Sequence, residues 1–138
     1  MKLSKSQCPS NPQEVLEMRD VPYAELVGCI QYLVVCTRPD LAHAASQVSK
    51  FMQNPGKAHW KAALRILRYL KGTLTFKFYF SKSPVTAHLT GFSDADHAGC
   101  LDTRRSHSGY IVKLNDTAIA WASRRQRCVA LSSCGVST

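Results

Sequence analysis

The sequence is short of acidic side chains, and none occurs after Asp116. Nine Asp and Glu oppose 18 Lys and Arg over 138 residues, which leaves a formal net charge of +9. A positive excess of this size favours polyanions as partners, nucleic acid before a membrane surface. The same charge is also consistent with a basic solvated surface that has no partner, so composition leaves both interpretations open.

Further absences narrow the class of protein. The six cysteines include no Cys-x-x-Cys pair, so the spacing of zinc ligands is missing and reduced thiols are expected. No apolar run is long enough to span a bilayer, and the first residues show no apolar segment typical of a signal peptide. We therefore expect a cytoplasmic or nuclear protein that is not secreted and has no membrane partner. With 45% hydrophobic residues, the chain can still form a core.

The first half of the chain has helical periodicity. Residues 1–22 form a polar lead-in, for which the sequence predicts no more than a short helical turn near Glu14–Met18. Apolar residues then recur at helical spacing over 23–36, 39–53 and 57–71. The predicted buried faces are Leu26, Val27, Ile30, Leu33 and Val34; Leu41, Ala44, Ala45, Val48, Phe51 and Met52; and Trp60, Ala63, Leu64, Leu67 and Leu70. The sequence thus predicts about three helices over 23–73.

After Gly72 the apolar period changes to two. Leu74, Phe76, Phe78 and Phe80 alternate with other residues, which predicts a half-buried strand. The row of Phe also suits stacking against nucleic-acid bases. Further strands are predicted at 87–93, 108–114 and 117–123, with a turn at Asn115-Asp116. The prediction is an α+β fold, in which the helical segment is followed by a partial, mainly antiparallel sheet over 74–138.

Five basic residues follow one another at helical spacing. They are Lys57, Lys61, Arg65, Arg68 and Lys71, at intervals of 4, 4, 3 and 3. These intervals place all five side chains on one face of a helix, which we call the basic stripe. A stripe of this kind is either a phosphate-binding surface or a solvated helix face, and the spacing alone does not decide between them.

Two carboxylates, Asp94 and Asp96, come at the end of a predicted strand and are framed by Gly91 and Gly99. Residues two apart in a strand point to the same face, so the two carboxylates share a face if the strand continues that far. Two like charges at that distance repel each other unless a cation lies between them, which favours a divalent metal site. The alternative is a polar strand end that enters an Asp- and Gly-rich turn.

Two groups of motifs resemble one known family. The second half contains, in order, Phe92–Gly99, Asp102–Tyr110, Ile119–Gln126 and Val129–Ser133. This series resembles the start of the ribonuclease H region of copia-type LTR retrotransposon Pol polyproteins. The first half resembles the end of the same family's reverse transcriptase, through Pro22-Tyr23, Leu26–Gly28, Thr37–Asp40, Phe51–Pro55, His59-Trp60 and Arg65–Thr73. The resemblance covers nearly the whole chain in one order.

The resemblance implies a role for each candidate residue. The helical segment is similar to the polymerase thumb and connection, so the basic stripe would contact the phosphates of a template–primer without reading sequence. Asp94 is similar to the first catalytic carboxylate and Asp96 to the second member of its pair, with Mg²⁺ or Mn²⁺ as the cofactor. His97 stands where the family has tryptophan. Further nucleic-acid contacts are expected from Arg104, Arg105, Arg124 and Arg125. The implied partners are an RNA–DNA hybrid or DNA, and the remaining segments of the polyprotein.

The family's next carboxylate follows a V-A-L-S-S motif, and here Ser133 is followed by Cys134-Gly135-Val136. We therefore expect a truncated chain whose catalytic set is incomplete and which binds metal weakly. The leading hypothesis is a Pol-derived fragment that binds nucleic acid without sequence specificity and without catalysis. Two alternatives stay open. One is a piece of an active reverse transcriptase–ribonuclease H polyprotein that hydrolyses the RNA strand of hybrids. The other is an unrelated basic structural or interaction module.

Overall fold

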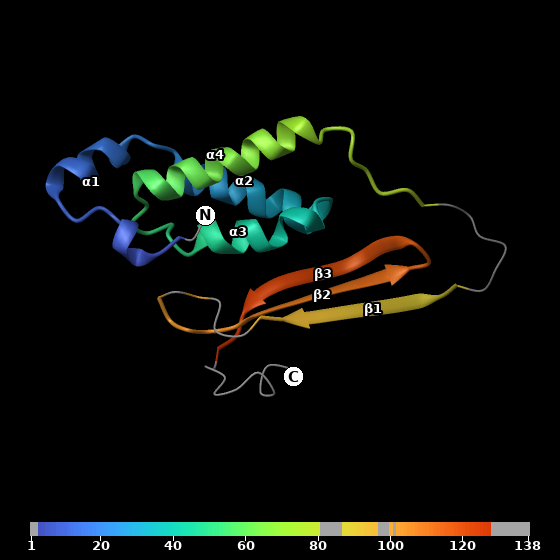
Figure 1. The fold of residues 1–138 in the computed structure, drawn as a ribbon. Helices are drawn as coiled ribbons and strands as arrows, with labels where there is room; N and C mark the ends of the chain where they lie inside the picture. Colours follow the sequence, from blue (N-terminus) through green and yellow to red (C-terminus); the bar gives the residue numbers. More distant parts are fainter. Residues whose placement is uncertain (1–2, 81–86, 97–99, 101, 128–138) are drawn as a thin grey trace. The chain divides into compact units, whose positions relative to one another are not determined.

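A computed structural model describes residues 3–80, 87–96, 100 and 102–127 (Figure 1). The chain divides into two compact units, Met1–Thr75 and Phe76–Thr138. The first is helical and the second contains an antiparallel sheet, so the predicted α+β class is confirmed. The sequence predicts the border between residues 73 and 74, two residues before this division. Within the described ranges, no helix combines the length and the apolar character that crossing a membrane requires.

The helical unit contains two short 3-10 turns and a series of α-helices in its described residues. Its elements are η1 (Lys5–Gln7), α1 (Pro12–Arg19), α2 (Tyr23–Cys36), η2 (Pro39–Leu41), α3 (Ala42–Ser49) and α4 (Lys57–Gly72). The start of α1 is capped by Asn11, whose side-chain oxygen accepts a hydrogen bond from the Glu14 N–H at 2.8 Å. The prediction of a single helix over 39–53 is wrong in detail. The structure has the 3-10 turn η2 there, followed by the shorter helix α3.

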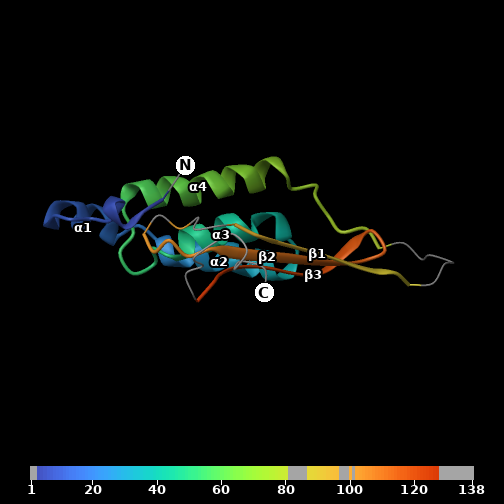
Figure 2. The ribbon, with the colours of Figure 1, turned by 60° about the horizontal axis from the view of Figure 1, so that its bottom comes forward.

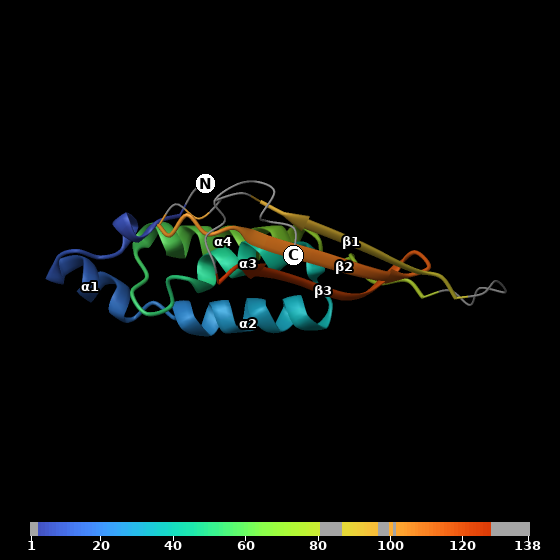
Figure 3. The same cartoon turned by 90° about the horizontal axis from the view of Figure 1, so that it is seen from below.

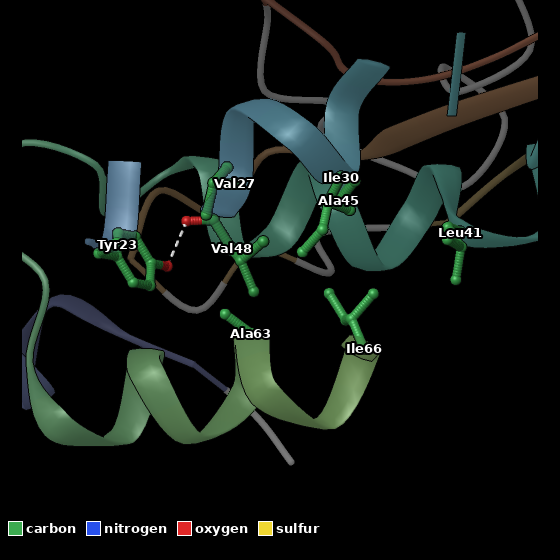
Figure 4. Close-up of a cluster of buried hydrophobic side chains, with 8 residues drawn as sticks. All are labelled: Tyr23, Val27, Ile30, Leu41, Ala45, Val48, Ala63 and Ile66. Atoms are coloured by element: carbon green, nitrogen blue, oxygen red, sulfur yellow. Dashed lines mark hydrogen bonds between the residues drawn. The ribbon is translucent and has the colours of Figure 1, made fainter. Parts of the chain in front are cut away.

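Helices α2, α3 and α4 pack against one another around the core of this unit (Figures 2 and 3). The core side chains are Tyr23, Val27, Ile30, Leu41, Ala45, Val48, Ala63 and Ile66 (Figure 4). The Tyr23 hydroxyl donates a hydrogen bond to the Val48 carbonyl oxygen at 2.7 Å. Burial raises the pKa of Tyr23 to about 12, with a smaller contribution from Cys8, so the phenol stays protonated and able to donate.

The described part of the lead-in, residues 3–22, is more ordered than predicted. It contains η1 and α1, and Leu3 packs against the core. One anchor of this segment is His59, which is fully buried at the start of α4. Its Nδ1 accepts a hydrogen bond from the Gly56 N–H at 2.9 Å, and its Nε2 lies 3.2 Å from the Ser4 carbonyl oxygen. Local periodicity cannot reveal a contact between residues 55 positions apart, so no pattern in the sequence indicates this anchor.

The buried face of α4 is rotated from the predicted one. His59, Ala63 and Ile66 are buried, whereas Leu67 is 39% exposed. Ile66 and Leu67 are adjacent, so both fit a helical apolar pattern, and the packing against α2 and α3 selects the first. Met52, predicted to be buried in the preceding helix, lies beyond the end of α3 and is exposed.

The described strands of the second unit are β1 (Leu89–Ala95), β2 (His107–Leu114) and β3 (Thr117–Arg125), in the order β1-β2-β3. Both pairs are antiparallel, and the predicted turn at Asn115-Asp116 joins β2 to β3. Asn115 has a positive φ of 53°, a conformation that asparagine tolerates better than most residues. Strand β1 begins and ends two residues later than predicted. A register shift between Val112 and Lys113 leaves Ile119 as an extra residue in β3.

The strand predicted over 74–80 is wrong. In the described residues this segment pairs with no strand, and Leu74, Phe76, Tyr79 and Phe80 are largely exposed. Two contacts nevertheless attach it to β3. The Phe78 ring lies 5.4 Å from the Trp121 ring between centroids, and the Thr117 hydroxyl donates to the Tyr79 carbonyl oxygen at 2.5 Å. Alternation of apolar residues does not make a strand where no neighbour supplies a hydrogen-bonding edge.

Candidate nucleic-acid interface

The basic stripe is exposed along α4. Lys57, Lys61, Arg65, Arg68 and Lys71 all lie on this helix, and each is an exposed residue. They occupy the side of the helix opposite to Ala63 and Ile66, which are buried against α2 and α3. A straight helix rises about 1.5 Å per residue, so the stripe extends over roughly 20 Å. The geometry therefore presents a row of cations to solvent on a rigid element.

One member of the stripe makes an ion pair. The Lys57 ammonium lies 2.6 Å from a carboxylate oxygen of Glu17, and this contact holds the pKa of Lys57 above its usual value. Lys57 is 63% exposed in its side chain, so the pair contributes little to stability. In the described part of the chain, no carboxylate forms an ion pair with the other four residues of the stripe. Four cations are therefore available to a polyanion.

The end of α4 is held by a buried arginine that sequence reasoning did not single out. Arg38 is 7% exposed and forms a bidentate pair with Asp40, with Nε–Oδ1 and Nη2–Oδ2 distances of 3.0 and 2.8 Å. Its Nη2 also donates to the Thr73 hydroxyl at 2.7 Å, and its Nη1 lies 3.4 Å from the Thr73 carbonyl oxygen. The guanidinium lies over the Tyr69 ring, 5.6 Å from its centroid. A cation at this place stabilises the carbonyl end of α4.

The Arg38–Asp40 pair also shifts the pKa of both partners. The hydrogen bond from Arg38 holds the pKa of the Asp40 carboxyl below its usual value, against a smaller opposing effect of burial. The hydrogen bond to Asp40 likewise raises the pKa of Arg38. The T-R-P-D segment was the sequence signal for the Arg38–Asp40 pair, because Pro39 fixes the backbone between the two charges. The contact between Arg38 and Thr73 had no such signal, because the two residues are 35 positions apart.

The arginines predicted in the second unit lie near one end of the β2–β3 pair, where His107 is the register partner of Arg125 and the Gln126 N–H donates to the Ser106 carbonyl oxygen. Arg104 and Arg105 lie in the connection before β2, where Arg104 is exposed and has a positive φ of 54°. Arg124 and Arg125 are exposed at the end of β3, and as neighbours in a strand they point to opposite faces of the sheet. They differ in this from the five basic residues of α4, which share one face of a single helix.

Asp94 and Asp96 share a face of the sheet. Asp94 lies within β1, and the Asp96 N–H continues the ladder by donating to the His107 carbonyl oxygen at 3.0 Å. Each carboxylate accepts a backbone hydrogen bond: Asp94 from the Ala95 N–H at 2.9 Å, and Asp96 from the His107 N–H. Arg125 pairs with His107 in the register, so a cation lies on the same face.

This arrangement does not fit a two-ion catalytic centre. Among the described residues, no group of three or more His, Cys, Asp and Glu could hold a metal ion. His97 lies outside the described residues. A centre that activates water and stabilises a leaving oxygen holds two ions about 3.5–4 Å apart, and two carboxylates are too few ligands for that geometry. Asp94 and Asp96 are suited to no more than one hydrated ion.

Comparison with known proteins places the chain among transposon sequences. It is 48% identical over 134 residues to the retrovirus-related Pol polyprotein from transposon TNT 1-94 of Nicotiana tabacum, a match that covers 96% of the chain and 10% of the polyprotein. It is 43% identical over 111 residues to the Pol polyprotein from transposon RE2 of Arabidopsis thaliana, covering 80% of the chain and 8% of that protein. No family model and no solved structure matches the chain.

Another relative is much shorter than the polyproteins and is similar in length to this chain. The chain is 51% identical over 116 residues to the secreted RxLR effector protein 161 of Plasmopara viticola, covering 84% of the chain and 81% of that protein. Through its similarity to the tobacco and Arabidopsis polyproteins, the chain belongs to the family of retrovirus-related Pol polyprotein sequences of transposons. It spans only about a tenth of the tobacco polyprotein.

Proposed function

We propose that the chain binds nucleic acid, and RNA–DNA hybrids in particular, through the basic stripe of α4, without reading sequence. The observation that carries this proposal is the exposed row of cations on a helix whose opposite face is buried. Lys and Arg side chains on one face neutralise phosphates and release counterions, which favours binding to any sequence. The excess of nine positive charges over the whole chain acts in the same direction.

Catalysis is not part of this proposal. Asp94 and Asp96 are too few to position two ions, so hybrid binding should be the same with Mg²⁺ or Mn²⁺ as without, once ionic strength is matched. Arg104, Arg105, Arg124 and Arg125 would add weaker phosphate contacts, because Arg124 and Arg125 point to opposite faces of the sheet and not along one face. We place this activity in the cytoplasm or nucleus, where exposed thiols such as Cys29 and Cys36 stay reduced.

The test is a salt titration with a blunt RNA–DNA hybrid. The triple variant Lys61→Gln, Arg65→Gln, Arg68→Gln should bind more weakly than the unmodified protein. If each side chain contacts one phosphate, the slope of log K against log[salt] should become shallower by roughly 0.9 per residue. The matched control is Arg19→Gln, Lys77→Gln, Arg127→Gln, which removes the same charge from exposed residues outside the stripe.

The two variants separate a local interface from a general charge effect. Equal slopes in both triple variants would show that only net charge matters and that the stripe is a solvated face. Salt-independent binding, or no binding at low salt, would favour the alternative of a basic structural module.

A second candidate function is supported by one observation. Asp94 and Asp96 lie on one face at the end of β1, as a piece of a hybrid-cleaving polyprotein would require. In that case the remaining segments of the polyprotein would supply the missing ligands. Metal-dependent cleavage should then appear only when those segments are present, and it should disappear in Asp94→Asn.

A further inference from the structure

A groove lies beside the basic stripe, between α3 and α4, and we call it the α3–α4 groove. It has a volume of about 560 Å³. Its floor is apolar and includes Leu41, Val48 and Ile66, which belong to the core of the helical unit. A concave site of this size with an apolar floor is typical of sites that take a small flat ligand or part of a larger one.

The rim of the groove is polar and aromatic. Helix α4 contributes Arg65 and the Tyr69 ring, and α3 contributes His43 and Gln47. Tyr69 is 44% exposed, and the Arg38 guanidinium over the ring holds its position. Aromatic rings held in this way are surfaces on which nucleic-acid bases stack, whatever their sequence.

The charges of the rim favour a polyanion. Asp40 also lines the groove, but its carboxylate is paired through two hydrogen bonds with the Arg38 guanidinium. Its negative charge is therefore compensated, and Arg65 leaves the rim with a positive balance. A phosphate that approaches Arg65 meets no uncompensated carboxylate from the described lining residues.

Arg65 belongs both to the groove and to the basic stripe. Lys61 and Arg68 lie roughly 10 Å apart along the helix axis, with Arg65 between them. A nucleic-acid strand whose phosphates follow these residues therefore passes the mouth of the groove. A base that is already paired is held within the duplex stack, whereas an unpaired base next to the duplex is free to turn into the groove.

We propose that the α3–α4 groove binds an unpaired nucleobase from a strand whose phosphates contact the basic stripe. This inference rests on the proposed function and deepens it, because it makes the ligand a duplex with a single-stranded end rather than any duplex. The base would lie on the apolar floor and stack on Tyr69, and its phosphate would contact Arg65.

The test compares hybrids that differ only in the bases of the overhang. Three ligands are used: a blunt hybrid, the same hybrid with a three-thymidine overhang, and the same hybrid with an abasic overhang of equal length and charge. The unmodified full chain should bind the thymidine overhang about tenfold more tightly than the abasic one, the magnitude expected from base stacking. The abasic ligand removes the base but keeps the phosphates, so the ratio does not report charge.

Groove-filling variants locate the site. Ala44→Phe places a ring in the groove and leaves the charges of the stripe unchanged, so the preference for the thymidine overhang should disappear while blunt binding stays the same. Ala62→Leu is a milder filling variant on the opposite wall, for use if Ala44→Phe does not fold. The control is Ala24→Phe, an exposed residue of α2 outside the groove, which should keep the tenfold ratio.

The outcomes separate the two proposals. Equal binding of thymidine and abasic overhangs by the unmodified protein would overturn the groove inference and leave the stripe intact. A preference that survives a correctly folded filling variant would place the base elsewhere and also overturn the inference. Failure to bind even the blunt hybrid at low salt would overturn the proposed function itself.

Discussion

The two units of this protein differ in how their apolar side chains are covered. In the helical unit, Val27, Ile30 and Ala63 are completely buried among three helices. In the described residues of the sheet unit, the buried apolar side chains are only Cys100 and Ala118, while Leu89 and Phe92 are 64% and 57% exposed. Both units have regular backbone hydrogen bonds, but they differ in how many apolar side chains are buried. Complete hydrogen bonding between strands therefore does not by itself provide a hydrophobic core. A sheet becomes stable when a second layer covers one of its faces.

The largest effect is expected from a pair of matched truncations, one in each unit. Ile30→Ala should destabilise the helical unit by about 2–5 kcal/mol, because it leaves a cavity at a position with no solvent exposure. Ile119→Ala should cost less than about 1 kcal/mol, because this side chain is 45% exposed on the extra residue of β3. Urea unfolding followed by circular dichroism measures both. Similar losses in the two variants would remove the contrast between the units.

The next effect concerns the charge pair that holds the end of α4. Arg38→Met should destabilise the helical unit by about 1.5–3 kcal/mol, since it removes hydrogen bonds to a charged partner and to Thr73. The pair also makes stability depend on pH. Because the folded pKa of Asp40 lies below that of the unfolded chain, the pair contributes fully above the unfolded value, about 3.9. This contribution is lost as pH falls through the lowered folded pKa.

Urea midpoints measured between pH 2 and pH 7 test this dependence. Asp40→Asn should flatten the acid limb of the profile for the helical unit, with Asp20→Asn, an exposed residue at the end of α1, as the control. An acid limb that is as steep in Asp40→Asn as in the unmodified protein would show that the pair does not stabilise the fold.

A smaller effect sharpens the account of the sheet unit. Phe78 contacts Trp121 although it belongs to no strand, so the two rings should be coupled by about 0.5–1.5 kcal/mol in a double-mutant cycle with alanine. Phe76→Ala is the control, because this ring is 61% exposed. Thermal unfolding of the sheet unit is the measurement, and a coupling energy near zero would mean that the segment is not attached to β3.

The smallest effect is expected at the carboxylate predicted to be catalytic. Asp94→Asn should change stability by less than about 0.5 kcal/mol and leave hybrid binding unchanged, because its hydrogen bond to the Ala95 N–H is made equally well by an amide oxygen. Titration with Mg²⁺ followed by NMR should show weak binding at most. Metal-dependent cleavage by this chain that is lost in Asp94→Asn would overturn this account and reveal an unrecognised ligand set.

Much of the helical unit could be predicted from local pattern. The stripes of apolar residues predicted α2 and α4 within about a residue of their ends, and the intervals between basic residues predicted the exposed face of α4. Apolar and basic residues recur on the same face at each turn of a helix, so several positions in the sequence support the same prediction. The shared face of Asp94 and Asp96 followed in the same way from the period of a strand.

The rest depends on partners that are distant in the sequence. The burial of Arg38 requires Thr73, and the docking of the lead-in requires the contact between Ser4 and His59. The segment 74–80 has the composition of a strand but lacks a neighbour in the described residues that would make it one. Local patterns indicate what a segment prefers, and tertiary contacts decide whether the preference is realised.

The extended segment between the units has a practical consequence for handling this protein. Leu74 and Phe76 are exposed on backbone that belongs to no helix or strand, and both are side chains after which chymotrypsin cuts. Exposed irregular segments are the usual sites of proteolytic nicking. A brief digestion should therefore part the chain near Thr75, and the products would show whether each half survives alone. The same exposure makes Thr75 the natural place to insert a purification tag or a longer linker, because it lies between Thr73, which Arg38 holds, and Phe78, which contacts Trp121.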